Sequence, residues 1–176
     1  MMELRFLHFL QSLHQPFLDA IMLLFSKLGD AGFIWIVLTV LFLCIPRYRK
    51  CGCMMAVALV LEATLCNGIL KNVIARQRPC WIDSSVTMLV KVPKDFSFPS
   101  GHTSAAFATV IPMLYMHRKE GIAALVVAIL VAFSRMYLFV HFPTDILGGM
   151  LLGIAAGIVS IMMIQKIEQK RKKQIL

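Results

Sequence analysis

Residues 144–165 read TDILGGMLLGIAAGIVSIMMIQ, and no charged side chain follows Asp145 in this stretch. A run of about 20 apolar residues is long enough for an α-helix to cross the hydrocarbon core of a bilayer. Within the run, Gly149, Gly153 and Gly157 recur every four residues, a spacing that lets a second helix approach one face closely. The stretch therefore predicts a membrane-spanning helix that packs tightly against a neighbour.

The rest of the chain has the same apolar character. Of its 176 residues, 59% are hydrophobic and 15% are charged, whereas soluble domains average about 45–50% apolar and about 25% charged residues. This composition excludes an intrinsically disordered chain and a soluble globule of this size. The net charge of +9 does not indicate nucleic-acid binding, because the basic residues lie in short clusters between apolar segments, as they do in membrane proteins.

The apolar segments define the expected architecture. They comprise residues 16–29, 32–46, 53–70, 101–116, 121–140 and 144–165. Several are shorter than the bilayer core requires, but flanking residues can extend them. We therefore expect an all-α bundle of six transmembrane helices, formed by residues 1–176 as a single domain. Residues 1–15 place apolar and polar side chains on opposite sides of a helix, which predicts an N-terminal amphipathic helix at the membrane interface.

Basic residues predict the orientation of the bundle. With six spans, one side would hold Arg5, Arg47, Arg49, Lys50, Arg118, Lys119 and the tail residues Lys166, Lys170, Arg171, Lys172 and Lys173. Cytoplasmic loops carry an excess of lysine and arginine, so we expect both termini to be cytoplasmic. The long stretch 71–100 and the turn near residues 139–144 would then face outward. The lysine-rich composition favours a bacterial inner membrane.

Three polar clusters interrupt the apolar pattern, all on the side predicted to be extracytoplasmic. They are residues 71–79 (KNVIARQRP), 99–102 (PSGH) and 134–145 (SRMYLFVHFPTD). In the first, Lys71 and Arg78 are about two helical turns apart, so we expect them to share one helix face. Pro79 is expected to end that helix. The second cluster begins an apolar helix, where free backbone N–H groups favour anions.

Together the clusters contain residues suited to a phosphate group. Arginine binds phosphate oxygens in pairs, lysine acts as a point charge, and a serine hydroxyl and a glycine amide can donate further hydrogen bonds. His102 and His141 can serve as nucleophile and acid, and Asp145 can fix the tautomer of a neighbouring imidazole. This combination predicts phosphoryl transfer. No acidic cluster suits Mg²⁺, so we expect neither a metal nor another cofactor.

In residue type, spacing and order, the clusters resemble the motifs of the type 2 phosphatidic acid phosphatase superfamily. Its pattern is Lys-x6-Arg-Pro, then Pro-Ser-Gly-His, then Ser-Arg-x5-His-x3-Asp, and this chain matches every position. The resemblance implies that His141 attacks phosphorus and forms a phosphohistidine, that Asp145 orients His141, and that His102 protonates the leaving oxygen and then activates water. It also implies that the phosphoryl oxygens are held by Lys71, Arg78, Ser100, Gly101 and Arg135.

The resemblance implies a lipid phosphate or diphosphate substrate, with membrane lipids as the other partners. Small bacterial members of this shape resemble undecaprenyl-diphosphatases, which is the function we favour; phosphatidylglycerophosphate or phosphatidic acid phosphatase is the alternative. In the loop 80–98, Lys91 and Lys94 either contact a second phosphate or are simply solvated. Two remote alternatives are a vanadium-dependent haloperoxidase, whose relatives are soluble and larger, and a non-enzymatic transporter or scaffold, which would not require the two histidines.

Overall fold

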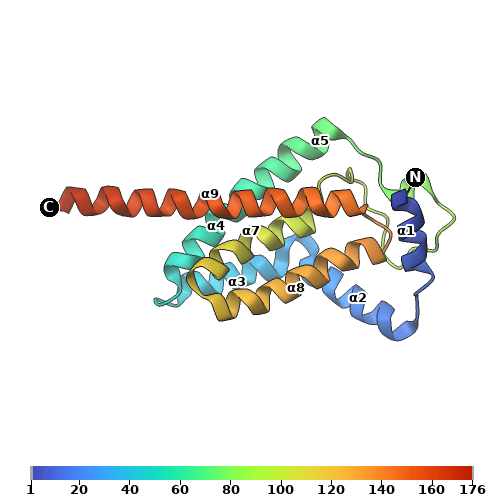
Figure 1. Ribbon diagram of the computed structural model, residues 1–176, viewed down its shortest axis with the longest axis horizontal. Coiled ribbons are helices and arrows are strands. Elements are labelled where there is room, and N and C mark those ends of the chain that lie inside the picture. The colour runs from blue at the N-terminus through green and yellow to red at the C-terminus, as the bar shows by residue number, and fades with distance from the viewer. Residues whose placement is uncertain (1, 176) are drawn as a thin grey trace.

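The computed structural model describes residues 2–175, and within them every regular element is helical, as the sequence predicts. In chain order the elements are α1 (Met2–Gln11), α2 (Pro16–Gly29), the 3-10 turn η1 (Asp30–Gly32), α3 (Phe33–Cys44), α4 (Arg49–Ala63), the π-helical segment η2 (Thr64–Leu70), α5 (Lys71–Ile74), α6 (Pro79–Ile82), α7 (Gly101–Met116), α8 (Arg118–Tyr137) and α9 (Pro143–Ile175). They form an elongated bundle beyond which the C-terminal part of α9 projects (Figure 1).

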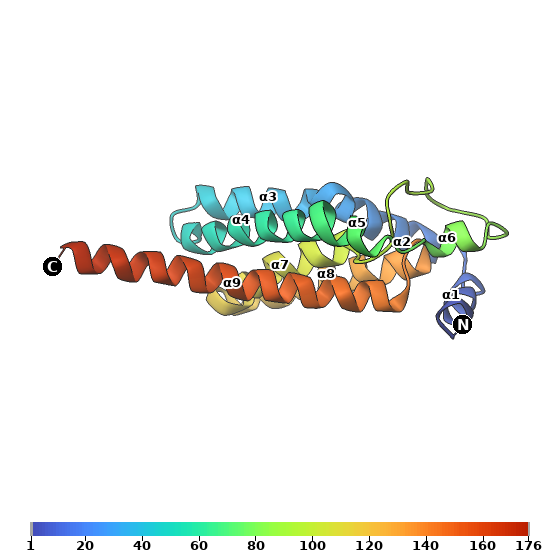
Figure 2. The same ribbon diagram turned by 90° about the horizontal axis from the view of Figure 1, so that it is seen from above.

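The first two predicted spans are consecutive parts of one segment. Helices α2 and α3 run in the same direction, and together with η1 they form the apolar stretch Pro16–Cys44 (Figures 1 and 2). A kink divides them at η1, where Ala31 and Gly32 have φ of 50° and 71°. The six-span prediction is therefore not confirmed, because an interruption by a polar turn was interpreted as a reversal of the chain.

The bundle instead contains five passes. Four helical stretches within the described residues are long and apolar enough to cross a membrane: Pro16–Cys44, Arg49–Ile82, Arg118–Tyr137 and Pro143–Gln174. The fifth pass is α7, which has 16 residues. Exposed side chains on the outside of these passes are often large and apolar, including Phe17, Val60, Leu151 and Met162. Length, composition and this apolar exterior identify a multi-pass membrane protein.

The two termini lie at opposite ends of the bundle (Figure 1). Helix α1 lies at the end that also holds α6 and the junction between α8 and α9. There His8 pairs with Asp83 at 3.0 Å, and the Gln11 side chain donates to the Tyr137 carbonyl at 2.7 Å. The basic part of α9 lies at the other end. The prediction that both termini share one side is therefore not confirmed, because α1 and the C-terminal part of α9 lie at opposite ends of the bundle.

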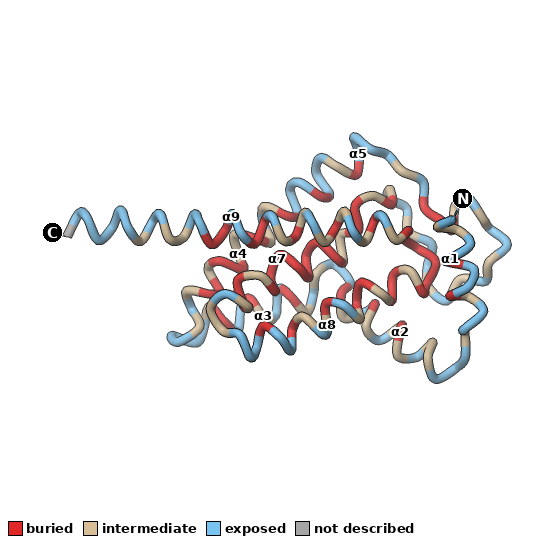
Figure 3. Tube along the Cα trace, viewed as in Figure 1, coloured by how far each residue is buried: buried red, intermediate tan, exposed pale blue. Residues whose placement is uncertain are grey.

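Helix α7 lies in the centre of the bundle, between α4, α8 and α9, and is largely buried (Figure 3). The three glycines of α9 face it, as predicted. A Cβ built on Gly149 would lie 2.6 Å from the Ser100 carbonyl oxygen, and one built on Gly153 would lie 2.4 Å from that of Ser104. No real side chain fits at such distances, so glycine allows α9 to contact the backbone of α7. This contact positions the beginning of α7, which carries the PSGH motif, against the beginning of α9.

Candidate active site

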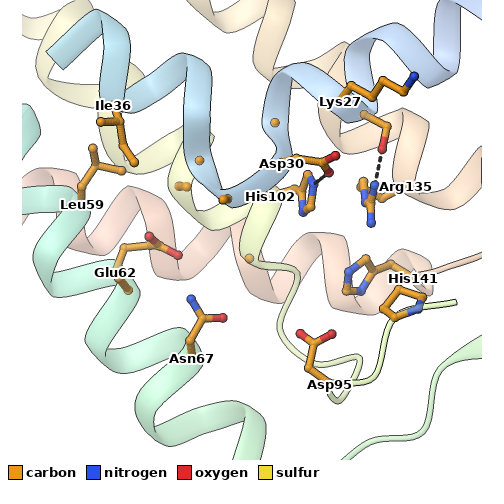
Figure 4. Close-up of a pocket in the computed structure, with 18 of the residues that line it drawn as sticks. Lys27, Asp30, Ile36, Leu59, Glu62, Asn67, Asp95, His102, Arg135 and His141 are labelled. Carbon is orange, nitrogen blue, oxygen red and sulfur yellow. Dashed lines mark hydrogen bonds and ion pairs between the residues drawn. The ribbon is translucent and has the colours of Figure 1, made fainter. Parts of the chain in front are cut away.

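A cavity of about 1370 Å³ brings most of the predicted site residues together (Figure 4). Its wall includes Lys71, Arg78, Gly101, His102, Arg135 and His141. These residues come from five parts of the chain: α5, the segment before α6, α7, α8 and the loop after α8. The same cavity extends along apolar residues of α3 and α4, including Ile36, Val40, Leu43, Leu59 and Val60.

The two cations of the first motif meet in a way that the sequence did not predict. The helix ends at Ile74, and Ala75 takes a left-handed conformation with φ of 47° and ψ of 39°. Arg78 is extended, and Pro79 begins α6 instead of ending the preceding helix. Lys71 and Arg78 therefore do not share a helix face. They converge because the backbone changes direction at Ala75, a residue type that rarely adopts this conformation and gives no sequence signal for it.

Asp95 joins these two cations. Its carboxylate forms an ion pair with the Lys71 ammonium and accepts from Arg78 Nη2 at 2.9 Å, while its carbonyl accepts from Arg78 Nε at 2.7 Å. Partial burial acts to raise the pKa of Asp95, but the hydrogen bond from Lys71 and the charge of Arg78 lower it to about 2. Trp81 supports this loop by donating to the Pro93 carbonyl at 3.0 Å. Sequence reasoning treated Asp95 only as part of the loop 80–98 and did not predict its contact with the two cations.

His141 is buried in the loop between α8 and α9 and forms part of the cavity wall. Its Nδ1 lies 3.5 Å from Asp145 Oδ2 and 3.4 Å from Ser97 Oγ, while its Nε2 lies 3.1 Å from Arg78 Nη1. Burial lowers the pKa of His141 to about 3; the nearby Arg78 and Arg135 charges add to this, and the Asp145 hydrogen bond opposes it. The imidazole is thus neutral near pH 7, the state that its predicted role as nucleophile requires.

Asp145 lies behind His141 and outside the cavity wall, where its carboxylate is fully hydrogen-bonded. Oδ2 accepts from Ser97 Oγ at 2.5 Å and from the Phe142 N–H at 2.8 Å, and Oδ1 accepts from Arg76 Nη1 at 2.7 Å. Arg76 also pairs with Glu3 of α1 at 2.7 Å. This network fixes the carboxylate beside the imidazole. Sequence reasoning assigned no role to Ser97 or Arg76, because neither spacing nor residue type shows which side chains reach Asp145.

The PSGH motif begins α7 as expected: Ser100 is the N-cap residue and Gly101 the first helical residue. Gly101 lines the cavity, and a Cβ built there would lie 3.8 Å from Lys71 Nζ. The free N–H groups of the helix start therefore lie beside a cation. Ser100 differs from expectation, since its buried hydroxyl accepts from Thr103 Oγ1 at 3.0 Å and does not line the cavity. Its predicted contact with phosphate would require rotation of that hydroxyl.

Arg135 and His102 complete the cavity on the side of α2 (Figure 4). Arg135 donates to the Ser26 hydroxyl, and its buried Nε has no hydrogen-bond partner among the described residues. An unpaired buried donor is costly, so an anion entering the cavity would find a free N–H group. His102 Nε2 lies 2.9 Å from Asp30 Oδ1. Sequence reasoning assigned Asp30 only to a turn between apolar segments.

A helical membrane bundle that gathers two histidines and three cations around one open cavity has the construction of a membrane-bound phosphatase. The chain belongs to the PAP2 superfamily, whose family model matches residues 51–169. This match confirms the family resemblance noted from the three motifs.

Named relatives in this family act on lipid phosphates. The chain is 33% identical to an undecaprenyl-diphosphatase of Sulfolobus acidocaldarius over 88% of this chain and 77% of that protein. It is 34% identical to phosphatidylglycerophosphatase B of Bacillus subtilis over 92% of this chain and 82% of that protein. Among solved structures, Aquifex aeolicus LpxE matches with a TM-score of 0.79 and 30% identity, covering 92% of this chain and 96% of the other.

Proposed function

We propose that the chain is a lipid phosphatase that removes a phosphate group at the outer membrane face, with undecaprenyl diphosphate as its favoured substrate. The observation that carries this proposal is the continuity of the cavity. Its cationic part contains Lys71, Arg78 and Arg135, and its apolar part follows α3 and α4. A molecule with a phosphorylated headgroup and a long apolar chain matches both parts, whereas a small soluble phosphate ester would leave the apolar part empty.

Additional cations support a diphosphate. Lys27, Lys91 and Lys94 line the same cavity as the three phosphate-binding cations. A terminal phosphoryl group bound by Lys71, Arg78 and Arg135 leaves these lysines for the second phosphate. The undecaprenyl-diphosphatase relative agrees with this assignment. Phosphatidylglycerophosphate is the second candidate, because a relative of 34% identity is named for that activity.

The proposed reaction has two steps, each carried by residues of the cavity. His141 Nε2 attacks the terminal phosphorus, a P–N bond forms, and the P–O bond to the lipid breaks while His102 gives a proton to the leaving oxygen. A water molecule then loses a proton to His102 and attacks phosphorus, which breaks the P–N bond and releases inorganic phosphate. The three cations and the start of α7 stabilise the charge on the phosphoryl oxygens. No metal ion takes part in this scheme.

Charge distribution supports placing the cavity outside. The turns at Arg47–Lys50 and Arg118–Lys119 and the C-terminal part of α9 lie at the end of the bundle remote from α1 (Figure 1). By the excess of basic residues in cytoplasmic loops, that end is cytoplasmic. The end with α1 and the loop 83–100 is then extracytoplasmic. Helix α1 would lie at this outer interface, where its exposed Phe6 and Phe9 contact lipid.

The test is phosphate release by purified protein in detergent containing EDTA. Undecaprenyl diphosphate, phosphatidylglycerophosphate and phosphatidic acid are supplied in parallel, and His141→Ala is the inactive control. We expect release that depends on His141, persists in EDTA and is fastest with undecaprenyl diphosphate. Faster release from phosphatidylglycerophosphate would replace the favoured substrate with the second candidate. Release that EDTA abolishes would contradict the mechanism, and no release from any lipid by folded protein would contradict the function.

A further inference from the structure

The second histidine of the cavity has its own carboxylate, which belongs to none of the three motifs. Asp30 Oδ1 lies 2.9 Å from His102 Nε2, and the bond is visible in Figure 4. Asp30 begins η1, on the segment between α2 and α3. The arrangement parallels that of His141, which also lines the cavity, and Asp145 behind it. Each imidazole is therefore paired with one carboxylate, and the two pairs come from different parts of the chain.

The surroundings of His102 explain why a carboxylate matters there. Arg135 of α8 and Lys71 of α5 line the same cavity as His102 and repel a positive imidazole. A general acid must nevertheless carry a proton before it can donate one. Asp30 is the acidic group hydrogen-bonded to His102. Its negative charge stabilises the protonated ring and holds one ring nitrogen, so that the other nitrogen is the one available to the reaction.

The backbone around Asp30 fixes this contact. Gly29 precedes it, and a Cβ there would lie 2.9 Å from His102 Cδ2 and 2.8 Å from Val131 Cγ1. Only glycine lets the end of α2 approach the imidazole so closely. The left-handed residues Ala31 and Gly32 then turn the chain into α3. The kink in the first membrane pass thus delivers a carboxylate to the cavity, at the point where the pass would otherwise continue as a regular helix.

We propose that Asp30 is the positioning residue of the general acid, so that the site works with two Asp–His pairs, one for the nucleophile and one for proton transfer. In the first step His102 donates its proton to the leaving oxygen as the P–O bond breaks, and in the second it accepts a proton from water. Asp30 keeps its charge throughout and stabilises the imidazolium in both steps. This inference rests on the proposed phosphatase function.

The test compares leaving groups, because only poor ones need a proton. General acid–base catalysis contributes about 10²- to 10⁴-fold, and Asp30→Asn keeps an oxygen for the hydrogen bond but removes the charge. We expect this variant to lose about 10- to 100-fold in phosphate release from phosphatidic acid, whose leaving group is an alkoxide. With p-nitrophenyl phosphate, whose leaving group needs no proton, the first burst of p-nitrophenolate should keep its rate, and only the following turnover should slow.

Four controls separate this role from structural support. Burst amplitude counts folded active sites, so a partly misfolded preparation does not alter the rate constants. Asp83→Asn removes the carboxylate of another Asp–His pair, the one between α1 and α6, and should leave both substrates unaffected. Asp30→Asn added to His102→Gln should cost nothing further, because the carboxylate acts through the imidazole. Asp30→Glu, which keeps the charge, should recover part of the rate.

Each outcome either supports or overturns the inference. Equal losses for both leaving groups, burst included, would show that Asp30 only supports the fold, and so would an additional loss in the His102→Gln background. The failure of the proposed function is a separate result, since wild-type protein would then release no phosphate from any lipid. If wild-type protein is active and Asp30→Asn matches it on phosphatidic acid, the proposed function stands and the second Asp–His pair does not.

Discussion

Asp95 holds Lys71 and Arg78 in the way that an incoming phosphate would, with carboxylate oxygens on both cations. A phosphate must therefore displace it, and because the pKa of Asp95 is lowered to about 2, acidification to pH 5 does not neutralise this competitor. Asp95→Asn should tighten inhibition by inorganic phosphate or orthovanadate about tenfold, equivalent to about 1.4 kcal/mol. Inhibition constants measured against p-nitrophenyl phosphate provide the test, and the control is Asp83→Asn, which removes a carboxylate from the same loop at a position that does not line the cavity.

An unchanged or weaker inhibition constant for Asp95→Asn would contradict this competition. It would mean that Asp95 stays bound to Lys71 and Arg78 when phosphate enters, and that it positions these cations instead of competing with phosphate for them. Asp83→Asn retains Asp95, so its inhibition constant should change by less than the tenfold expected for Asp95→Asn.

The protonation state of His141 gives a second prediction at this scale. Burial lowers its pKa to about 3, and a lowered histidine pKa means that the neutral ring persists as the pH falls through 6.5. The ring should therefore remain neutral from pH 8 down to about pH 5, whereas an exposed histidine protonates near pH 6.5. Long-range nitrogen–proton NMR spectra of labelled protein, with His141→Gln used to assign the signal, measure this directly. Protonation of that signal near pH 6.5 would contradict the burial argument.

At the residue scale, the sequence identifies the groups that we propose to react but not the groups that hold them. His102, His141, Arg78 and Arg135 meet in one cavity because the motifs lie on neighbouring helices of one bundle. Asp30 could not be found in this way, because its contact with His102 joins residues 72 positions apart. Which of the other polar residues contact a motif residue depends on the tertiary structure.

At the scale of elements, the glycine spacing predicted that α9 packs closely against a neighbouring helix, and that neighbour is α7. This contact gives the clearest prediction about stability. In Gly153→Ala the new Cβ would lie 2.4 Å from the Ser104 carbonyl oxygen and 2.8 Å from Phe107 Cβ. Backbone cannot yield as a flexible side chain does, so α9 must move away. We expect a loss of about 1–3 kcal/mol, measured as a lower midpoint of thermal unfolding in detergent.

Gly68→Ala is the matched control for this substitution. Gly68 lies in η2, and a Cβ built there has no neighbour within 4 Å. Alanine favours helix over glycine by up to about 1 kcal/mol, so the same substitution should leave stability unchanged or raise it. If both variants unfold at the same temperature, close packing at Gly153 does not limit stability.

Element boundaries were less predictable where single backbone conformations decide them. Ala75 is left-handed and ends α5, and the left-handed Ala31 and Gly32 kink the first pass. Alanine carries no signal for such a conformation, so the sequence favoured a longer helix at the first site. At the second, apolar segments separated by a short polar turn fit a hairpin and a kinked helix equally well. The amphipathic pattern of residues 1–15 did predict α1, because the helical period of its apolar residues can be recognised without knowledge of the tertiary structure.

For the whole molecule, the number of passes decides where the N-terminus lies. Six passes would put both termini on one side, whereas five passes put α1 at the end with the cavity and the C-terminal part of α9 at the other. Of the basic residues that six passes would place at the cytoplasmic end, only Arg5 moves to the end with the cavity, while Arg47–Lys50, Arg118, Lys119 and the tail stay at the remote end. The remote end therefore keeps the excess of basic residues that the charge rule expects on the cytoplasmic side.

Cysteine labelling of intact cells tests this arrangement, with the five free cysteines first replaced by serine or alanine. Single cysteines are then introduced at three exposed positions: Ser12 after α1, Ser85 in the loop after α6, and Lys172 in the tail. Five passes predict that a membrane-impermeant maleimide labels Ser12→Cys and Ser85→Cys from outside, and Lys172→Cys only after the cells are opened. Six passes predict that Ser12→Cys is protected together with Lys172→Cys. If Ser85→Cys is not labelled in intact cells, the cavity faces the cytoplasm. The protein could then not act on a phosphate group at the outer face of the membrane.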